Sequence, residues 1–191
     1  MTQTPRQAHR LATWRALREA TVRLVAERGL AAVTVDDVVA AAGTSRRTFF
    51  NYFPTKAAAL FDPDPELTGL LQRLTEEAPR TDDVWADACA ICRAVVREGP
   101  GDLLVVYRRV AGSGELRDYP VEVHRHVEAA LESWASGRLA GDALAARLVA
   151  ATAGAALTSA FRTWDPATPP EEFARLADRA LAAVEVHPTG T

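Results

Sequence analysis

The sequence is poor in cysteine and in long apolar runs, and each shortage argues against a class of protein. Cys89 and Cys92 are the only cysteines, too few for a disulfide framework, so a reducing cytoplasm is expected. No uninterrupted apolar run of about 18 residues occurs, so we expect no membrane span. The N-terminus carries basic residues but no apolar core, which makes a secretory signal unexpected. These shortages favour a cytoplasmic protein that has no membrane partner.

Catalytic motifs are also lacking. The sequence contains no nucleophile elbow with a Ser-His-Asp order, no phosphate-binding loop and no HExxH. Cys89 and Cys92 form a CxxC, but neither a second CxxC nor a histidine pair at zinc spacing accompanies it. Both lie on the apolar stripe of an expected helix, which favours core packing or pocket lining; a redox or metal role is the alternative. We therefore expect no enzyme activity, no metal and no cofactor.

The charge is unevenly distributed along the chain. Residues 1–61 carry nine basic and four acidic side chains, a net charge of +5. The remainder of the chain has a net charge of −8, which brings the total to −3. A basic third on an acidic body indicates that one end contacts a polyanion. Charge asymmetry alone fits a solvated face equally well.

The chain is predicted to be all-α, with about nine helices, because strand signals are nearly absent and 3.6-residue periodicity recurs. The first helix is expected from about residue 9 to 28, ending at Gly29. Thr34 and Ser45 are natural N-caps for two short helices, and the second of these ends before Pro54. A fourth helix begins at Lys56 and is interrupted or broken at Asp62–Pro65. Further helices are expected near 66–77, 81–98, 101–112, 120–136, 141–163 and 170–185.

The stretch "SRRTFFNYF", Ser45 to Phe53, combines arginines and aromatic rings on one short helix. On a helical wheel, Phe49 and Phe53 define the inner face, and Arg47 and Asn51 lie opposite. Arginine and asparagine suit bidentate hydrogen bonds to guanine and adenine in the major groove. This wheel also fits an ordinary amphipathic helix of a bundle. The tight turn "AAGTS", the basic domain and the order of elements favour a helix-turn-helix instead.

The segment "TVDDVVAAAGTSRRTFFNYFPTKAAAL", Thr34 to Leu60, resembles the DNA-binding signature of TetR-family transcriptional regulators. The resemblance implies that a recognition helix faces DNA bases and that neighbouring side chains bind phosphates. The base-facing residues implied are Arg46, Arg47, Phe50 and Asn51; the phosphate-binding residues are Thr34, Thr48, Tyr52 and Lys56, and Thr44 and Ser45 complete the expected DNA site. The family usually has tyrosine at the position of Phe50, where this chain retains only an apolar contact such as one with a thymine methyl group.

The resemblance further implies a dimeric regulator with two domains, a helix-turn-helix domain at 1–61 and an effector-binding and dimerisation domain at 62–191. The stretch expected to be helical at 141–163 is apolar or small nearly all round, with Leu144, Leu148 and Ala155 on one side and Leu157 and Phe161 on another. Such a helix needs cover on several faces. We expect the homodimer to form through residues 141–185.

Large residues on several expected helices predict an effector pocket. Trp85, Tyr107, Trp134 and Phe161 lie on stripes that should converge among alanines, and Cys89 shares the stripe of Trp85. Tyr107 could donate a hydrogen bond, and Arg108 or its neighbour could meet an anionic group. The alternative is a fully packed core with both arginines in solvent.

The function expected from these features is a ligand-responsive transcriptional regulator, a repressor that a small apolar or aromatic molecule releases from a palindromic double-stranded operator. Alternatives are a redox-responsive regulator acting through Cys89 and Cys92, an activator, and a purely structural helical dimer. The structural dimer leaves the Arg47–Asn51 face unexplained.

Overall fold

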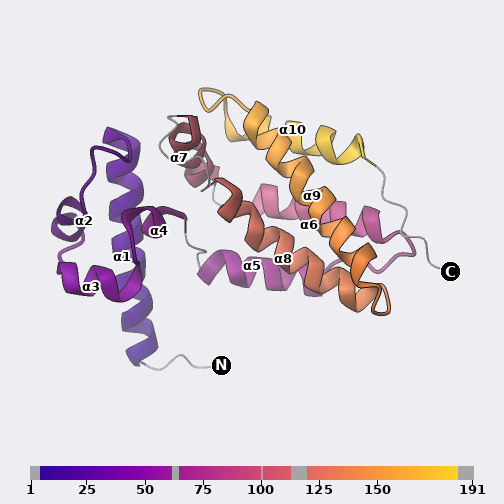
Figure 1. Cartoon of the computed structure of the whole chain (residues 1–191), viewed down its shortest axis with the longest axis horizontal. Coiled ribbons are helices and arrows are strands. Elements are labelled where there is room, and N and C mark those ends of the chain that lie inside the picture. Colours follow the sequence, from indigo (N-terminus) through magenta and orange to yellow (C-terminus); the bar gives the residue numbers. More distant parts are fainter. Residues whose placement is uncertain (1–4, 62–64, 100, 113–119, 185–191) are drawn as a thin grey trace. The chain divides into compact units, whose positions relative to one another are not determined.

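The computed structural model of the chain describes residues 5–61, 65–99, 101–112 and 120–184. The chain divides into two compact units, the first holding residues 1–62 with 110–117 and the second holding 63–109 with 118–191. Ten helices and no strand lie in the described residues (Figure 1), which confirms the all-α prediction. The helices are α1 Pro5–Arg28, α2 Val35–Ala41, α3 Arg46–Tyr52, α4 Lys56–Phe61, α5 Pro65–Glu76, α6 Val84–Glu98, α7 Gly101–Gly112, α8 Pro120–Arg138, α9 Ala143–Thr163 and α10 Pro170–Ala182.

The first unit packs three short helices on the long helix α1. Its core is made by fully buried side chains from each element, namely Leu17, Val33, Val38, Phe49, Phe53 and Leu60. Thr21 is buried in α1, and its hydroxyl donates to the carbonyl of Leu17 at 2.8 Å, which satisfies a polar group that would otherwise be costly to bury. Helices as short as α2 and α3 are unstable alone, so tertiary packing holds them in place.

Two glycines end helices in this unit. Gly29 adopts φ +79° after α1, and its N–H donates to the carbonyl of Val25 at 2.9 Å. Gly43 adopts φ +63° in the turn between α2 and α3. The left-handed region disfavours a residue with a Cβ, so each glycine allows a sharp change of direction.

Helix boundaries differ from the sequence expectation most clearly at the start of α1 and after α4, and by up to three residues elsewhere. Helix α1 begins at Pro5, about one turn before the expected residue 9, because proline lacks an N–H and is accepted at the first helical position. The expected break at Asp62–Pro65 leaves two separate helices, α4 and α5, so the described residues hold ten helices. Residues 62–64 of that segment lie outside the described residues.

The second unit is built around α9, which packs along α8 on one side and α10 on the other (Figure 1). Its interior contains fully buried side chains from α8, α9 and α10, among them Leu131, Val149 and Leu181, with Trp164 directly after α9. Aromatic rings join the last two helices: Phe161 and Trp164 lie 6.1 and 5.7 Å from Phe173, centroid to centroid. Aromatic burial of this kind dominates core energetics.

A buried ion pair also holds this unit together. Arg138 at the end of α8 donates to the carboxylate of Asp87 on α6 at 2.8 Å, and Asp87 is only 2% exposed. The hydroxyl and backbone N–H of Thr81 donate to the same carboxylate, both at 2.9 Å. Burial alone raises the pKa of Asp87, but the hydrogen bonds from Arg138 and Thr81 outweigh it and hold that pKa below its usual value.

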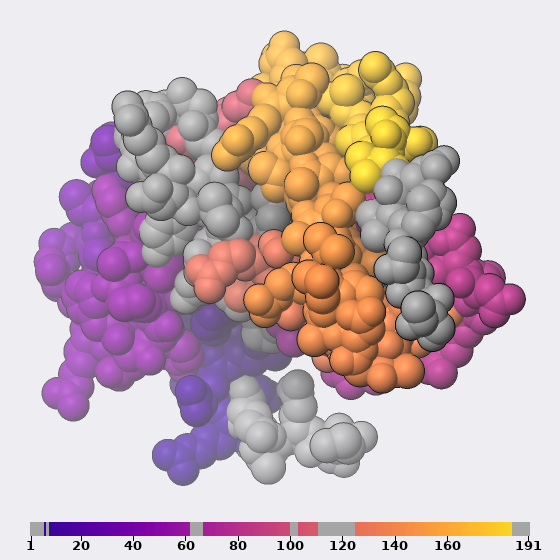
Figure 2. Space-filling model, turned by 45° about the vertical axis from the view of Figure 1, so that its right-hand side comes forward, coloured from indigo at the N-terminus to yellow at the C-terminus, as the bar shows by residue number. Residues whose placement is uncertain are grey.

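Helix α9 is long and apolar enough to cross a membrane by length and composition, yet more than half of that stretch is buried inside the protein. Its exposed apolar residues lie on one side, with Leu144 and Leu148 69% and 50% exposed. Figure 2 shows α9 uncovered along one face of the second unit. We interpret the apolarity of α9 as that of a core helix with a second apolar face.

Candidate DNA-binding site and effector domain

The turn between α2 and α3 is set by side-chain caps. The Thr34 hydroxyl accepts from the N–H of Asp37 at 3.2 Å, and the Asp37 carboxylate accepts in return from the Thr34 N–H at 2.9 Å. This capping box satisfies the first donors of α2. Hydrogen bonds from Thr34 and the charge of Arg28 hold the pKa of Asp37 below its usual value. Thr34, predicted to bind phosphate, thus has its hydroxyl committed to capping α2.

Ser45 performs the same task for α3. Its hydroxyl accepts from the N–H of Thr48 at 3.1 Å and lies 2.9 Å from the Thr48 hydroxyl. The N–H of Thr44 donates to the carbonyl of Val39 at 2.9 Å and so completes the turn. Ser45 is exposed and Thr44 and Thr48 are half-buried, so these three expected DNA contacts lie together at the start of α3.

The inner face of α3 consists of two rings. Phe49 is fully buried and Phe53 is 1% exposed. The ring of Phe53 lies 5.7 Å from that of Trp14 on α1, and Phe49 and Phe53 lie 5.8 Å apart. These contacts fix α3 on α1, and they leave its other side to solvent.

The outer face of α3 carries the predicted base-reading residues. Arg47 and Asn51 are exposed, and Phe50 is 50% exposed with its ring edge-on to Phe49 at 5.4 Å. Tyr52 is half-buried, with its ring 6.5 Å from Phe53. A short helix that presents arginine, asparagine and an aromatic ring in one patch has the groups that read base edges in a major groove.

Arg46 is exposed, but it is paired. Its Nη1 lies 2.8 Å from Oδ2 of Asp36 on α2, and both side chains are more than half exposed. The sequence reasoning missed Asp36, because ten residues and a turn separate the two and only the fold brings them together. An exposed pair of this kind adds little stability, so its consequence is the orientation of the guanidinium.

Lys56 points into the protein. Its Nζ donates to the carbonyl oxygens of Leu30 at 2.6 Å and Val33 at 2.8 Å, in the loop between α1 and α2. A third, longer contact of 3.5 Å joins Nζ to the carbonyl oxygen of Ala31, so the lysine ties the start of α4 to that loop and each of its three N–H groups has a carbonyl partner. Its predicted phosphate contact remains a prediction.

Three of the residues predicted to line an effector pocket have structural partners. The indole N–H of Trp85 donates to the carbonyl of Val184 at 2.8 Å. Arg108 donates to the carbonyls of Arg162 and Trp164 at 2.8 and 3.0 Å, which caps the end of α9. Phe161 belongs to the aromatic cluster with Phe173. These contacts fit a packed interior, but Arg108 caps α9 instead of lying in solvent, where the alternative to a pocket predicts it.

The remaining pocket candidates differ in exposure. Tyr107 and Cys89 are buried, and Trp134 is half-buried with the guanidinium of Arg138 over its ring at 5.5 Å. This cation–π contact joins Trp134 to the arginine that pairs with Asp87. A ligand at Trp134 would thus lie next to the buried ion pair.

Both cysteines are free and buried. Burial raises the pKa of Cys92 to about 12 and also raises that of Cys89. The thiolate is the reactive form of cysteine, so both side chains are poorly suited to nucleophilic or redox chemistry at neutral pH. Among the described residues, no group of three or more His, Cys, Asp or Glu side chains could hold a metal.

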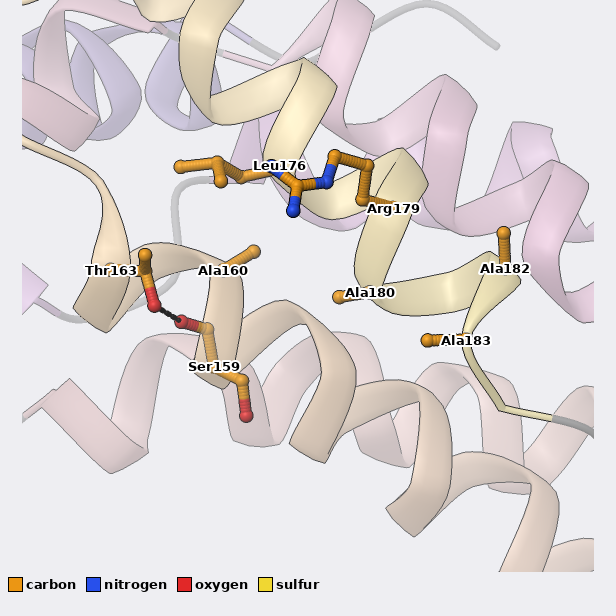
Figure 3. Close-up of a pocket in the computed structure, with 8 residues that line it drawn as sticks. All are labelled: Ser159, Ala160, Thr163, Leu176, Arg179, Ala180, Ala182 and Ala183. Carbon is orange, nitrogen blue, oxygen red and sulfur yellow. Dashed lines mark hydrogen bonds between the residues drawn. The ribbon is translucent and has the colours of Figure 1, made fainter.

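An open groove runs between α9 and α10 (Figure 3). Small and apolar side chains line most of it, and Arg179 extends over it from α10. The Thr163 hydroxyl donates to the Ser159 carbonyl at 2.8 Å, so this threonine keeps its polar group within α9. The lining residues are Ser159, Ala160, Thr163, Leu176, Arg179, Ala180, Ala182 and Ala183.

Residues 17–62 match the family model of bacterial regulatory proteins of the tetR family. No characterised protein gives a significant sequence match over the chain. Among solved structures, a TetR-family transcriptional regulator from Pectobacterium atrosepticum superposes with a TM-score of 0.57 at 18% identity, over 95% of this chain and 93% of that chain. Salmonella enterica GusR superposes with a TM-score of 0.50 at 20% identity, over 90% of this chain and 94% of that chain. A transcriptional regulator from Rhodococcus sp. Rha1 superposes with a TM-score of 0.50 at 20% identity, over 89% of this chain and 94% of that chain. At these identities, the structural likeness shows the fold alone.

Proposed function

We propose that this chain, whose residues 17–62 match the model of tetR-family regulatory proteins, represses transcription as a homodimer on a palindromic operator and is released by a small apolar molecule. Residues 1–61 bind DNA in this proposal, and residues 62–191 bind the effector and dimerise. TetR-family regulators are generally non-enzymatic DNA-binding proteins, which fits the lack of catalytic motifs in the sequence.

The division of α3 into two faces carries the proposal. Phe49 and Phe53 anchor the helix, while Arg47 and Asn51 are exposed and serve no packing purpose. Arginine pairs with guanine O6 and N7, and asparagine pairs with adenine N6 and N7. We assign base reading to the exposed pair, with Phe50 as an apolar contact for a thymine methyl group.

The second face of α9 supports dimerisation. Leu144, Leu148 and Ala155 lie at helical spacing on its exposed side, and the groove shared with α10 begins one turn after Ala155, at Ser159. Exposed leucines in line on one face of a helix fit a protein interface. Two copies of α9 and α10 would form a four-helix interface within residues 141–185, in the class of about 2,000 Å² or more.

The proposed mechanism has two states. A dimer that binds its operator holds two recognition helices about 34–36 Å apart, one turn of the major groove. An effector that binds better to a dimer with a different spacing lowers operator affinity by the ratio of its affinities for the two states. The direction of regulation follows from where the operator lies, and a transcription assay with and without the regulator separates repression from activation.

The effector is proposed to be apolar or aromatic and to bind in the second unit at Trp134 and Tyr107. Because Arg108 caps α9, an anionic effector that used this arginine would have to draw it from the carbonyls of Arg162 and Trp164. A thermal-shift screen of acyl thioesters, aromatic acids and hydrophobic antibiotics tests this site, since a ligand of the folded state raises the melting temperature. Trp134→Ala should abolish the response to a hit and spare operator affinity. If a hit releases DNA equally well from wild type and from Trp134→Ala, the effector binds elsewhere.

The experiment that tests DNA reading is selection of operators from random DNA, followed by anisotropy titration. Arg47→Ala should weaken operator binding by about 1–3 kcal/mol per subunit and leave binding to scrambled DNA much less affected. Arg97→Ala, an exposed arginine on α6, is the matched control for the lost charge. An unchanged ratio of operator to scrambled affinity in Arg47→Ala would refute base reading by this residue.

The redox alternative makes an opposite prediction for the cysteines. Both thiols are buried and the pKa of each is raised. The double variant Cys89→Ala/Cys92→Ala should therefore bind the operator with an affinity within a few-fold of that of wild type. Mild oxidation should change neither wild type nor the double variant. Loss of DNA binding on oxidation in wild type alone would establish a redox-responsive regulator.

A further inference from the structure

A basic stripe on α1 lies next to the recognition helix and outside the helix-turn-helix. Arg6, Arg10 and Trp14 follow at intervals of four residues and therefore lie along one side of α1. Arg18, one turn further along, is buried with its guanidinium 5.1 Å above the Trp14 ring. Arg6 and Arg10 are therefore the exposed part of the stripe. Residues 1–18 contain four arginines and no acidic side chain, so this end of the helix is strongly basic.

The structure fixes where this stripe begins. The ring of Trp14 lies 5.7 Å from that of Phe53, the residue that caps the end of α3. Arg10 and Arg6 lie one and two turns further out, about 6 and 12 Å beyond Trp14 along the helix axis. Figure 1 shows the first turns of α1 continuing past α3 toward the N-terminus. Both arginines are exposed.

The dimensions of DNA match this placement. The major groove is about 12 Å wide, and a base pair rises about 3.4 Å. When α1 lies along the duplex, a rod that starts at the end of α3 and extends about 12 Å spans about three to four base pairs beyond the bases that α3 contacts. Guanidinium groups bind phosphate bidentately, which suits arginines in these positions.

We propose that Arg6 and Arg10 form a second DNA contact, with the phosphate backbone that flanks each half-site of the operator. The inference rests on the proposed function, because it needs α3 in the major groove. It adds a sequence-independent contact, so it contributes affinity and salt dependence but no base preference.

The test combines a protein change with a DNA change. Arg6→Gln/Arg10→Gln removes four phosphate contacts from a dimer, so the slope of log affinity against log salt should fall by about 3.6. Affinity near physiological salt should fall about ten-fold or more, equally for operator and scrambled DNA. Arg80→Gln/Arg97→Gln, two exposed arginines of the second unit, removes the same charge and should leave the slope unchanged.

Trimming four flanking base pairs from each end of the duplex should weaken wild type to the level of Arg6→Gln/Arg10→Gln and leave that variant unaffected. Equal effects of trimming on both proteins, or a wild-type salt slope in the variant, would overturn the proposal. The trimming experiment on wild type decides the matter even if the variant folds poorly. Failure of wild type to bind any selected DNA would instead refute the proposed function.

Discussion

Helices α3 and α9 expose opposite kinds of surface. Helix α3 is seven residues long and presents arginine, asparagine and one ring, whereas α9 is 21 residues long and presents leucine and alanine. Each is anchored by an aromatic cluster, Phe49 and Phe53 in the first case and Phe161 with Trp164 and Phe173 in the second. The anchors are alike, so the exposed face alone distinguishes a surface suited to a nucleic acid from one suited to a protein.

The polar groups of the two units differ in the same way. In the first unit, Thr34 and Ser45 cap helices through N–H groups three residues away, and Lys56 reaches the carbonyls of the loop between α1 and α2. In the second unit, the most buried charge, Asp87, joins segments that are distant in sequence. Removing the Thr34 or Ser45 cap should thus have local consequences, whereas removing the Asp87 carboxylate should weaken the whole second unit.

The largest effect is expected at Asp87. Asp87→Ala should destabilise the second unit by about 3–5 kcal/mol, because it leaves the Arg138 guanidinium without its buried partner. Chemical denaturation followed by circular dichroism measures the loss. Asp83→Ala, which removes an exposed N-cap of α6, should cost only about 0.5–2 kcal/mol. Equal costs for the two variants would show that the buried pair contributes no more than a cap.

The same carboxylate gives a pH dependence with a definite sign. The pKa of Asp87 is lower in the folded protein than in the unfolded chain, so its contribution is fully present above the unfolded pKa of about 3.9. That contribution is lost as the pH falls below this value toward the folded pKa. Asp87→Ala should therefore flatten the acid limb of the stability curve and leave the neutral region parallel to wild type.

A large effect is also expected at the exposed face of α9. Leu148→Arg places a charge in the middle of the apolar stripe and should convert the proposed dimer to monomer at micromolar concentration. Sedimentation velocity measures the change. Arg147→Leu, at the neighbouring exposed position, alters the same turn without adding a charge to the stripe and should remain dimeric. A monomeric wild type, or a dimeric Leu148→Arg variant, would exclude this face as the interface.

Lys56 separates a structural role from a DNA-binding role. Lys56→Met keeps the apolar stem but leaves the carbonyls of Leu30 and Val33 without their donor, so we expect a loss of about 1.5–3 kcal/mol in the stability of the first unit. The salt slope of DNA binding should stay that of wild type. A slope that falls by about 0.9 per subunit, with stability unchanged, would instead support the phosphate contact implied by the family resemblance.

The sequence predicted the first unit well because its signals are local. Thr34 and Ser45 are caps within four residues of the N–H groups they satisfy, and the Phe49–Phe53 spacing reveals the inner face of α3 directly. The direction of the Lys56 side chain could not be predicted, because its partners are more than 20 residues away. The ion pair between Arg46 and Asp36 could not be predicted either, because ten residues and a turn separate the two side chains in the sequence.

In the second unit, the stripes of α9 were predictable, but the partners of single side chains were not. Arg108 was predicted to meet a ligand anion, and the structure places it on the carbonyls of Arg162 and Trp164. The partner of the Trp85 indole lies 99 residues away, at Val184. Periodicity shows which face of a helix is apolar, whereas the contacts made by that face depend on how distant helices pair.

The smallest effect is expected for the Arg46–Asp36 pair, and it concerns specificity. Both groups are exposed, so Asp36→Asn should leave the free energy of unfolding within error of wild type. The carboxylate repels DNA phosphates and holds Arg46 in one orientation, so its removal should raise affinity for scrambled DNA a few-fold at low salt and lower the ratio of operator to scrambled affinity. Glu171→Gln on α10 is the control for net charge.

A double-mutant cycle decides whether the pair itself is responsible. Asp36→Asn should change the operator-to-scrambled ratio in wild type and leave it unchanged in the Arg46→Ala background, because there the carboxylate has no guanidinium to orient. The gain in affinity for scrambled DNA should persist in both backgrounds, since it comes from the lost repulsion alone. A specificity change of equal size in both backgrounds would mean that Asp36 acts on DNA directly, as a repulsive group that discriminates between sequences by groove shape.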